Sequence, residues 1–425
     1  MNKLLEKFME IYEKTPGYVV VGKHKHSAIK PCHWFEQKMF TGMRHCYKEK
    51  FYGIKSHQCL QNSPMIFCNH RCIYCWRIHP NDVGLLIDET SLEELNLDDP
   101  KTIVNEMIEA QKQMVKKKYP LKRLLQHYEN IVIVLEALFR EKQLSLNSLA
   151  TKTKLSKRKI KSALRHLLRE EYVIEISEEK YMISEGIKKE ISTVTDIEDI
   201  IKQKIANPEL VKRVWEEAAY PKHAAISLTG EPMMYPYIDE MVSEFHKKGF
   251  TTFIVTNGTF PERLSEMDEL PTQLYVTLPA PNEKIYKKVC VPYVKNGWEK
   301  LNQTLELLES LSCRTVIRIT AVKNLNMVEP EKYAKIVEKA NPNFLEVKGF
   351  TLIGGARLRL TKYAKRKGLN TEDIAKTFQP KHKDIVEFAS KICEAANFPI
   401  IDQFKPSAVA LIAVNWNKKS TKIIE

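Results

Sequence analysis

The second half of the chain alternates short apolar runs with longer stretches whose apolar residues recur every three or four positions. The short runs fall at 224–228, 252–255, 274–277, 315–320 and 344–348. Short apolar runs bounded by turns predict buried strands, and the stretches between them predict helices. Strand and helix in alternation are typical of parallel βα units. We therefore predict an α/β fold, a partial (β/α) barrel with parallel strands, built from residues 63–123 and 196–425.

A different pattern occupies residues 124–195. Apolar positions mark three helices there, the last of them after Ser156, a residue type that favours the N-cap. Two alternating runs, 172–176 and 180–184, then predict a hairpin. Three helices and a hairpin resemble a winged helix-turn-helix, so we expect an inserted α+β module. Residues 1–62 remain as an N-terminal segment, and 92–118 has a helical pattern.

Charge changes the picture in the same region. The chain of 425 residues carries 67 Lys and Arg against 53 Asp and Glu, a net charge of +14. Between Glu141 and Glu170 there is no acidic residue. A basic third helix is where such modules meet a nucleic-acid backbone. A solvated face or a protein-docking surface is the alternative.

The chain shows no apolar stretch of membrane-spanning length, and its amino terminus lacks the core of a signal peptide. We therefore expect a cytoplasmic protein. In that compartment clustered cysteines indicate metal or cluster ligation rather than disulfides.

Six of the nine cysteines lie between Cys32 and Cys75. Cys68, Cys72 and Cys75 have the spacing C-x3-C-x2-C, and three such thiols can hold an iron-sulfur cluster while one iron stays without a protein ligand. A zinc site is the alternative, but its thiols usually come as two close pairs. The spacing favours the cluster.

Three more cysteines, Cys32, Cys46 and Cys59, are separated by 13 and 12 residues. They either hold a second cluster or are buried free thiols. Lys48 lies two positions after Cys46. A partly desolvated lysine beside a cluster can form a Schiff base with a ketone, although a lysine taken alone is more often on the surface. The remaining cysteines, Cys290, Cys313 and Cys393, are expected to be structural.

Polar residues follow several predicted strands, where barrel enzymes place their chemistry. Gly230 and Glu231 end the first run, and Asn257 ends the second. A carboxylate accepts hydrogen bonds from an ammonium group, and a side-chain amide forms hydrogen bonds with a carboxylate or a ribose. These ends therefore predict a binding site for a polar ligand.

Together these features resemble the radical S-adenosylmethionine (SAM) enzymes, with an aromatic residue just before the last cysteine of the triplet and a Gly-Glu-Pro turn. The match is closest to the tRNA 4-demethylwyosine synthase family. The segments that carry it are the cysteine trio with 46–48, 68–77, 223–232, 255–259, 286–290, 315–320 and 346–349.

This resemblance implies a radical SAM lyase of tRNA processing that condenses N1-methylguanosine-37 of tRNA(Phe) with pyruvate to form 4-demethylwyosine, in wybutosine biosynthesis. It implies SAM and two [4Fe-4S] clusters as cofactors, and Lys48 as the residue that binds pyruvate, either as an imine or beside pyruvate chelated by the second cluster. The implied metal ligands are Cys68, Cys72 and Cys75 for one cluster and Cys32, Cys46 and Cys59 for the other. The implied SAM contacts are Tyr74, Gly230, Glu231, Asn257, Thr277 and Arg318. The flavodoxin-like domain of eukaryotic relatives is absent from the sequence, which implies an external electron donor.

Some positions depart from the family pattern. Pro279 stands where an acidic residue is usual, Val291 where a basic one is, and 350–357 lacks expected polar side chains. These positions bear on the substrate pocket. A radical SAM enzyme acting on another RNA base or on a peptide is therefore an alternative, and an iron-sulfur redox-sensing, nucleic-acid-binding regulator is a third.

Overall fold

The computed structural model describes residues 3–85, 95–169, 171–186, 188 and 197–423. Its large sheet has ten strands in the order β1-β2-β3-β7-β8-β9-β10-β11-β13-β12. These strands are β1 (Val19–Val21), β2 (Ser27–Ile29), β3 (Cys59–Ser63), β7 (His223–Ile226), β8 (Thr251–Thr256), β9 (Gln273–Thr277), β10 (Arg314–Ala321), β11 (Phe344–Gly349), β12 (Ile400–Phe404) and β13 (Val409–Ala413).

The centre of this sheet is parallel from β3 through β11, and the outer strands on both sides pair antiparallel. The five predicted strands correspond to β7 through β11, with ends shifted by at most two residues. The α/β fold with parallel strands is thus confirmed. Because the strands run in parallel, their carboxyl ends meet at one edge of the sheet.

Strand β3 was not predicted, although it begins at Cys59. Its sequence, Cys-Leu-Gln-Asn-Ser, has one strongly apolar side chain. It is a strand because it pairs with β7, where Cys59 lies opposite His223. A central strand made mostly of polar residues has no apolar run, so the pattern of apolar positions does not predict it.

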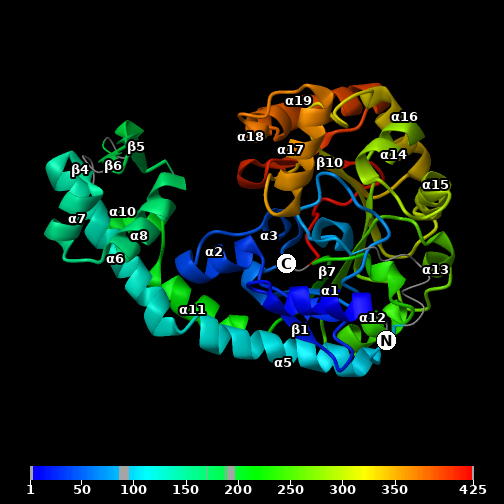
Figure 1. Cartoon of the computed structure of the whole chain (residues 1–425), viewed down its shortest axis with the longest axis horizontal. Coiled ribbons are helices and arrows are strands. Elements are labelled where there is room, and N and C mark those ends of the chain that lie inside the picture. The colour runs from blue at the N-terminus through cyan, green and yellow to red at the C-terminus, as the bar shows by residue number, and fades with distance from the viewer. Residues whose placement is uncertain (1–2, 86–94, 170, 187, 189–196, 424–425) are drawn as a thin grey trace.

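Helices surround the sheet (Figure 1). They are α1 (Lys3–Lys14), α2 (His33–Thr41), α3 (Tyr47–Tyr52), α5 (Pro100–Lys118), α11 (Pro208–Ala218), α12 (Ile238–Lys247), α13 (Pro261–Ser265), α14 (Glu283–Cys290), α15 (Gly297–Leu307), α16 (Pro330–Ala340), α17 (Gly355–Lys367), α18 (Ile374–Phe378) and α19 (His382–Ala396). The apolar faces of most of these helices join the inner sheet residues in one large core.

Helix α5 begins later than the predicted start of the pattern. Asp99 is its N-cap and accepts from the backbone of Thr102, and Pro100 occupies the first turn. Both residue types favour a helix start at this point. Residues 95–99 are therefore not helical, and 92–94 lie outside the described part of the chain.

The module contains α6 (Leu121–Glu141), α7 (Leu146–Thr153), α8 (Lys157–Arg169), and a sheet of β4 (Gln143–Ser145), β5 (Val173–Ser177) and β6 (Lys180–Ile183). The predicted helices and hairpin are present, and Ser156 accepts from the backbone of Lys159 at the start of α8. Strand β4 pairs with β6 and was not predicted. The order helix, strand, two helices, hairpin is that of a winged helix.

The module has a hydrophobic core of its own, which also takes in Ile200 and Ile201 of α10 (Ile197–Lys204). It stands beside the barrel at the end of a long arm made by α5 and α6 (Figure 1). The boundaries 124–195 and the other domain limits stay predictions. No helix in the described ranges is long and apolar enough to cross a membrane.

Candidate functional site

One cavity of about 480 Å³ lies at the carboxyl ends of the parallel strands. Its lining includes every residue that the sequence singled out for chemistry: Cys32, Cys46, Lys48, Cys59, Cys68, Cys72, Tyr74, Cys75, Gly230, Glu231, Asn257, Thr277 and Arg318. Residues separated by up to 286 positions in the chain therefore line the same cavity.

The loop that carries the cysteine triplet is fixed from two sides. Gly230 has a φ of +68°, and a Cβ there would lie 2.0 Å from the carbonyl oxygen of Met65, so only glycine fits. The next amide, that of Glu231, donates to the Phe67 carbonyl over 2.7 Å. This turn after β7 therefore holds the residues just before Cys68.

The other end of the loop is held by α17. The Gly355 amide donates to the Trp76 carbonyl over 2.9 Å. The buried guanidinium of Arg359 donates to the carbonyl oxygens of Cys75 and Arg77 and pairs with Asp82. These bonds fix the backbone around the last cysteine of the triplet.

Charges around the triplet are unevenly distributed. Burial alone would raise the pKa of Cys75, but a bond with His79 and the charge of Arg77 lower it to about 6. Burial raises the pKa of Cys68 well above its ordinary value. Buried thiols of this kind are normally metal ligands or inert core residues, and their place on a cavity wall favours ligands.

Glu231 is buried at 2% exposure and occupies the floor near Cys68. It accepts from the Thr256 hydroxyl over 2.6 Å, from the Asn257 amide over 2.8 Å and from the Met233 amide over 3.1 Å. Burial raises its pKa. These donors fix a carboxylate that suits a cationic ligand group.

Asn257 links a strand end to the cysteine loop. Its side-chain amide donates to the side-chain oxygen of Asn69 over 2.8 Å, and its own oxygen accepts from Thr259. Asn69 lies between Cys68 and Cys72. Asn257 therefore helps to position the loop as well as lining the cavity.

Another part of the lining is cationic. Lys48 is 9% exposed, and its Nζ lies 5.0 Å from the ring centroid of Phe253 and 4.9 Å from that of Tyr275. Burial and the nearby charge of Arg318 lower the pKa of Lys48. The same two causes lower the pKa of Lys348, at the end of β11, to about 8. Three cations thus face one part of the cavity.

Arg318 is held in place by other protein groups. Its guanidinium donates to the carboxylate of Glu346 over 3.0 and 3.1 Å and to the Tyr47 hydroxyl over 2.6 Å. Glu346 also accepts from the Tyr52 hydroxyl over 2.7 Å. The arrangement ties β10 and β11 to α3, the helix that carries Lys48.

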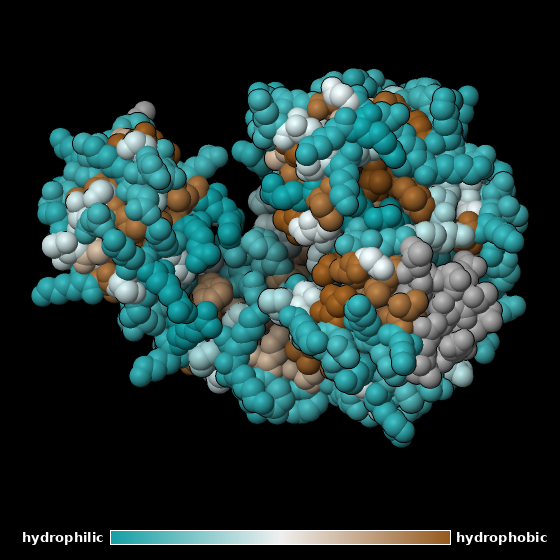
Figure 2. Space-filling model, viewed as in Figure 1, coloured by the Kyte–Doolittle hydropathy of each residue, from teal (hydrophilic) through white to brown (hydrophobic). Residues whose placement is uncertain are grey.

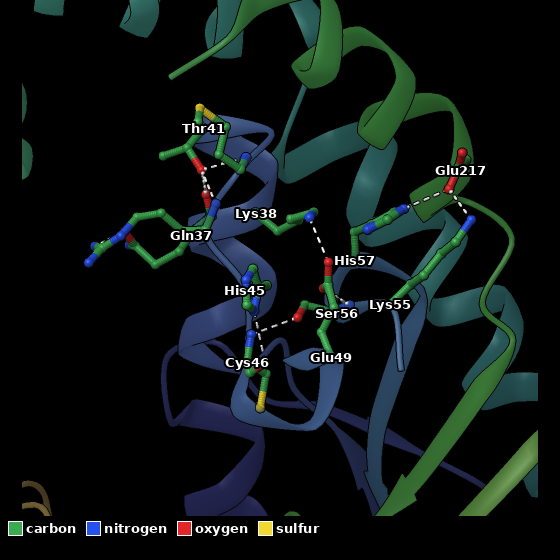
Figure 3. A network of polar contacts seen from close by, with 12 residues as sticks. Gln37, Lys38, Thr41, His45, Cys46, Glu49, Lys55, Ser56, His57 and Glu217 are labelled. Carbon is green, nitrogen blue, oxygen red and sulfur yellow. Dashed lines mark hydrogen bonds and ion pairs between the residues drawn. The ribbon is translucent and has the colours of Figure 1, made fainter. Parts of the chain in front are cut away.

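A polar network fixes the start of α3 from the outside (Figure 3). The Cys46 amide donates to the Ser56 hydroxyl over 2.8 Å, and the Ser56 amide donates to Glu49 over 2.8 Å. Lys38 of α2 pairs with Glu49 over 2.7 Å. This network joins α2, α3 and the segment before Cys59, so it sets the relative places of Cys32, Cys46 and Cys59.

Two cavity residues were missed or misassigned by sequence reasoning. Cys290, expected to be structural, lines the cavity, and its Sγ lies within 4.8 Å of the ligand atoms of Cys72 and His70. Lys348 lies in a segment used for the family match but was not singled out. Its position at a strand end was the available signal.

The departures from the family pattern are divided between cavity and surface. Pro279, Phe350, Thr351 and Ile353 line the cavity. Val291 is 38% exposed and ends α14 in a left-handed conformation, with φ 44°. The apolar positions at 279 and 350–353 therefore bear on ligand shape, whereas Val291 does not line the cavity.

Comparisons with known proteins agree with this geometry. Residues 189–337 match the Radical SAM superfamily, and residues 339–414 match Wyosine base formation. The S-adenosyl-L-methionine-dependent tRNA 4-demethylwyosine synthase of Pyrococcus horikoshii is 37% identical over 408 residues, covering 95% of this chain and 87% of that protein. Its counterpart in Methanocaldococcus jannaschii is 28% identical over 413 residues, covering 96% and 97%.

A solved structure of TYW1 with a lysine-pyruvate adduct bound has the same fold, with a TM-score of 0.62. It is 24% identical to this chain, and the match covers 100% of this chain and 99% of that one. The cysteine triplet lies outside both matched family ranges. Its assignment therefore depends on the cavity itself.

Proposed function

This chain belongs to the tRNA 4-demethylwyosine synthase family of radical SAM enzymes, and we propose that it condenses N1-methylguanosine-37 of tRNA(Phe) with pyruvate to form 4-demethylwyosine. The observation that carries the proposal is the single cavity shared by two cysteine trios, a buried carboxylate and a cationic wall.

The donor sets fit two iron-sulfur clusters. All six thiols lie on the cavity lining, and each trio would offer three ligands, so each cluster would keep one iron free of protein ligands. Cys68, Cys72 and Cys75 would hold the cluster that binds SAM, and Cys32, Cys46 and Cys59 a second one. When bound, a reduced cluster and SAM together supply the radical that removes a hydrogen from an otherwise inert methyl group.

The carboxylate of Glu231 would accept from the SAM ammonium group. It is held for that purpose by the donors from Thr256, Asn257 and Met233. Tyr74 and Thr277 lie on the same lining and would contact the rest of SAM. Because the site is fixed before the ligand arrives, little reorganisation is needed on binding.

Lys48 would engage pyruvate. Its amine would add to the ketone carbon, and loss of water would give an imine whose carbon accepts the methylene derived from the base; the bond from that carbon to the carboxylate then breaks. Arg318 and Lys348 would attract the pyruvate carboxylate, which later leaves as carbon dioxide. The lysine-pyruvate adduct of the solved TYW1 supports this assignment.

The target base must leave its stack to reach the cavity. An anticodon loop is single-stranded, so that movement costs less than in a duplex. The apolar residues Pro279, Phe350 and Ile353 line the cavity and offer uncharged contacts for a methylated purine. We therefore assign them to the base.

The proposal is tested by incubating the anaerobically reconstituted protein with SAM, dithionite, pyruvate and tRNA(Phe) bearing N1-methylguanosine. Digestion and mass spectrometry should reveal 4-demethylwyosine. The variant Cys313→Ala, altered away from the cavity, is the matched control for Cys72→Ala, which should give none. Cleavage of SAM by the wild-type protein with unchanged tRNA would contradict the proposed substrate.

A further inference from the structure

Two helices on different parts of the molecule belong to long acid-free segments. Residues 142–169, which include α8, contain nine Lys and Arg and no Asp or Glu. Residues 347–371, which include α17, contain seven Lys and Arg and no Asp or Glu, although Lys348 lines the cavity and Arg359 is buried beside Asp82. Together these segments hold more positive charge than the net +14 of the whole chain. A face that only confers solubility usually mixes both signs, so this segregation indicates a polyanionic ligand.

Three arginines of helix α8 share one face. Arg158, Arg165 and Arg169 are exposed and recur seven and four positions apart, the spacing of one helical face. The opposite face is buried in the module core. Of the other cations of this helix, Lys161 pairs with Glu179 over 2.6 Å, whereas Lys157 and Lys159 are also exposed.

Packing between helices connects α8 to the cavity. Helix α2 packs on α6, where the ring centroids of Phe40 and His127 are 5.0 Å apart. His127 of α6 in turn lies beside His166 of α8, with Nε2 and Nδ1 3.4 Å apart. His33 and Trp34 line the cavity. Helix α8 is therefore connected to the cavity wall through α6 and α2.

Helix α17 connects a second cationic surface to the cavity. It follows the cavity-lining residues 350–353 directly. Lys362, Lys365 and Arg366 are exposed on one of its faces. Figure 1 shows α17 on the side of the barrel toward the module, with α2 between the two. Figure 2 shows module and barrel as separate lobes with a hollow between them.

We propose that this hollow holds the double-stranded stem of an RNA hairpin, with α8 and α17 contacting its two backbones and its loop entering the cavity. The inference rests on the proposed function, because it takes the loop base as the substrate. Duplex RNA is bound through shape, phosphates and 2′-hydroxyls rather than base edges. Cationic helices on opposite sides of a hollow suit that mode, whereas a single-stranded ligand would need stacking surfaces along the path.

The test uses the full chain without SAM, reductant or pyruvate, so that it does not depend on chemistry. Three triple variants are compared: Arg158→Ala with Arg165→Ala and Arg169→Ala in α8, Lys362→Ala with Lys365→Ala and Arg366→Ala in α17, and Lys332→Ala with Lys335→Ala and Lys339→Ala in α16. The last is a matched control, since α16 lies away from the module (Figure 1). All nine residues are exposed, so melting temperatures should agree.

Binding is measured by fluorescence anisotropy to the unmodified anticodon stem-loop of tRNA(Phe) and to its loop sequence as an unpaired strand, from about 50 to 200 mM salt. The α8 and α17 variants should each bind the stem-loop about tenfold more weakly, with the slope of log K against log salt reduced by about 2 to 3. The control should match the wild type, and no variant should change binding of the unpaired strand.

Wild-type affinity and slope in either helix variant would overturn the proposal, as would equal losses in the α16 control. Failure of the wild-type chain to bind the stem-loop would also overturn it and would favour an acidic protein partner. If the wild-type protein forms no 4-demethylwyosine while the two helix variants still bind the stem-loop more weakly, the proposed function is refuted, and only the binding of an RNA stem in the hollow is supported.

Discussion

The guanidinium of Arg318 donates to the hydroxyl of Tyr47 over 2.6 Å, although the two residues lie 271 positions apart. Tyr47 immediately precedes Lys48 and follows Cys46. The bond therefore connects a central strand of the barrel with the segment that carries both a cysteine of the second trio and Lys48. Arg318 acts in this structure as a residue that positions α3.

We predict that Tyr47→Phe displaces Lys48 without affecting SAM cleavage. The change leaves a buried donor of Arg318 without its partner, which costs about 1–3 kcal/mol. Borohydride trapping of pyruvate on Lys48 should fall several-fold, whereas release of 5′-deoxyadenosine under reducing conditions should stay at the wild-type level. The change Tyr52→Phe, which leaves Arg318 paired with Tyr47, serves as the control. Equal trapping in Tyr47→Phe and wild type would show that the bond does not position the lysine.

Each cysteine trio should account for about half of the bound iron, if each holds a [4Fe-4S] cluster. Replacing Cys68, Cys72 and Cys75 by Ala should remove half of the iron and abolish SAM cleavage. Replacing Cys32, Cys46 and Cys59 should also remove half but leave SAM cleavage intact. Iron and sulfide analysis of the anaerobic proteins provides the measurement. Unchanged iron in the second set of variants would eliminate the second cluster.

The strands that form the wall of the cavity could be predicted because each is an apolar run next to a turn. Strand β3 could not, since its polar residues are buried only through pairing with β7. The two cysteine trios could be predicted from spacing within a short segment. The proximity of Cys290 to Cys72 could not, because it depends on the fold bringing α14 against the cysteine loop, where the Ile73 amide donates to the Val289 carbonyl.

Lys48→Arg should separate two routes for pyruvate. Arginine keeps the positive charge but cannot form the imine, whereas Lys48→Ala removes both. Borohydride with labelled pyruvate should add mass to the peptide containing Lys48 in the wild type and in neither variant. Lys348→Arg is the control, and it should retain the adduct on Lys48. Full product formation by Lys48→Arg would rule out an obligatory imine and favour chelation of pyruvate by the second cluster.

The contact between the module and α2 contains a buried pair of histidines. The Nε2 of His127 and the Nδ1 of His166 lie 3.4 Å apart. Burial, with a smaller effect of nearby Arg123 and Arg165, lowers the pKa of His127 to about 4. Burial, with smaller effects of His127, Arg44 and Arg169, lowers the pKa of His166 to about 3. Both imidazoles are therefore neutral at pH 7.

Acid should loosen the module, because the unfolded histidines take up protons near pH 6.5 and the folded ones do so only near pH 4. The contribution of these histidines to the free energy of unfolding is fully present above pH 6.5. It falls as the pH drops below 6.5, by about 2 kcal/mol per histidine at pH 5. Hydrogen exchange in α8 should accelerate between pH 7 and pH 5, after correction for intrinsic rates, while β10 serves as the internal control. The double variant His127→Leu with His166→Leu should lose most of this acceleration. The same acceleration in the double variant would assign the effect to other groups.

The central claim, that two carbons of pyruvate become part of a methylated guanosine in tRNA, is tested most directly by carbon labelling. The reconstituted protein is incubated with SAM, dithionite, methylated tRNA(Phe) and pyruvate labelled with ¹³C at all three carbons, and the nucleosides are analysed by mass spectrometry. The account predicts a new nucleoside that contains two labelled carbons, with the third released as carbon dioxide. A product with three labelled carbons, or an unlabelled product formed equally well without pyruvate, would contradict it.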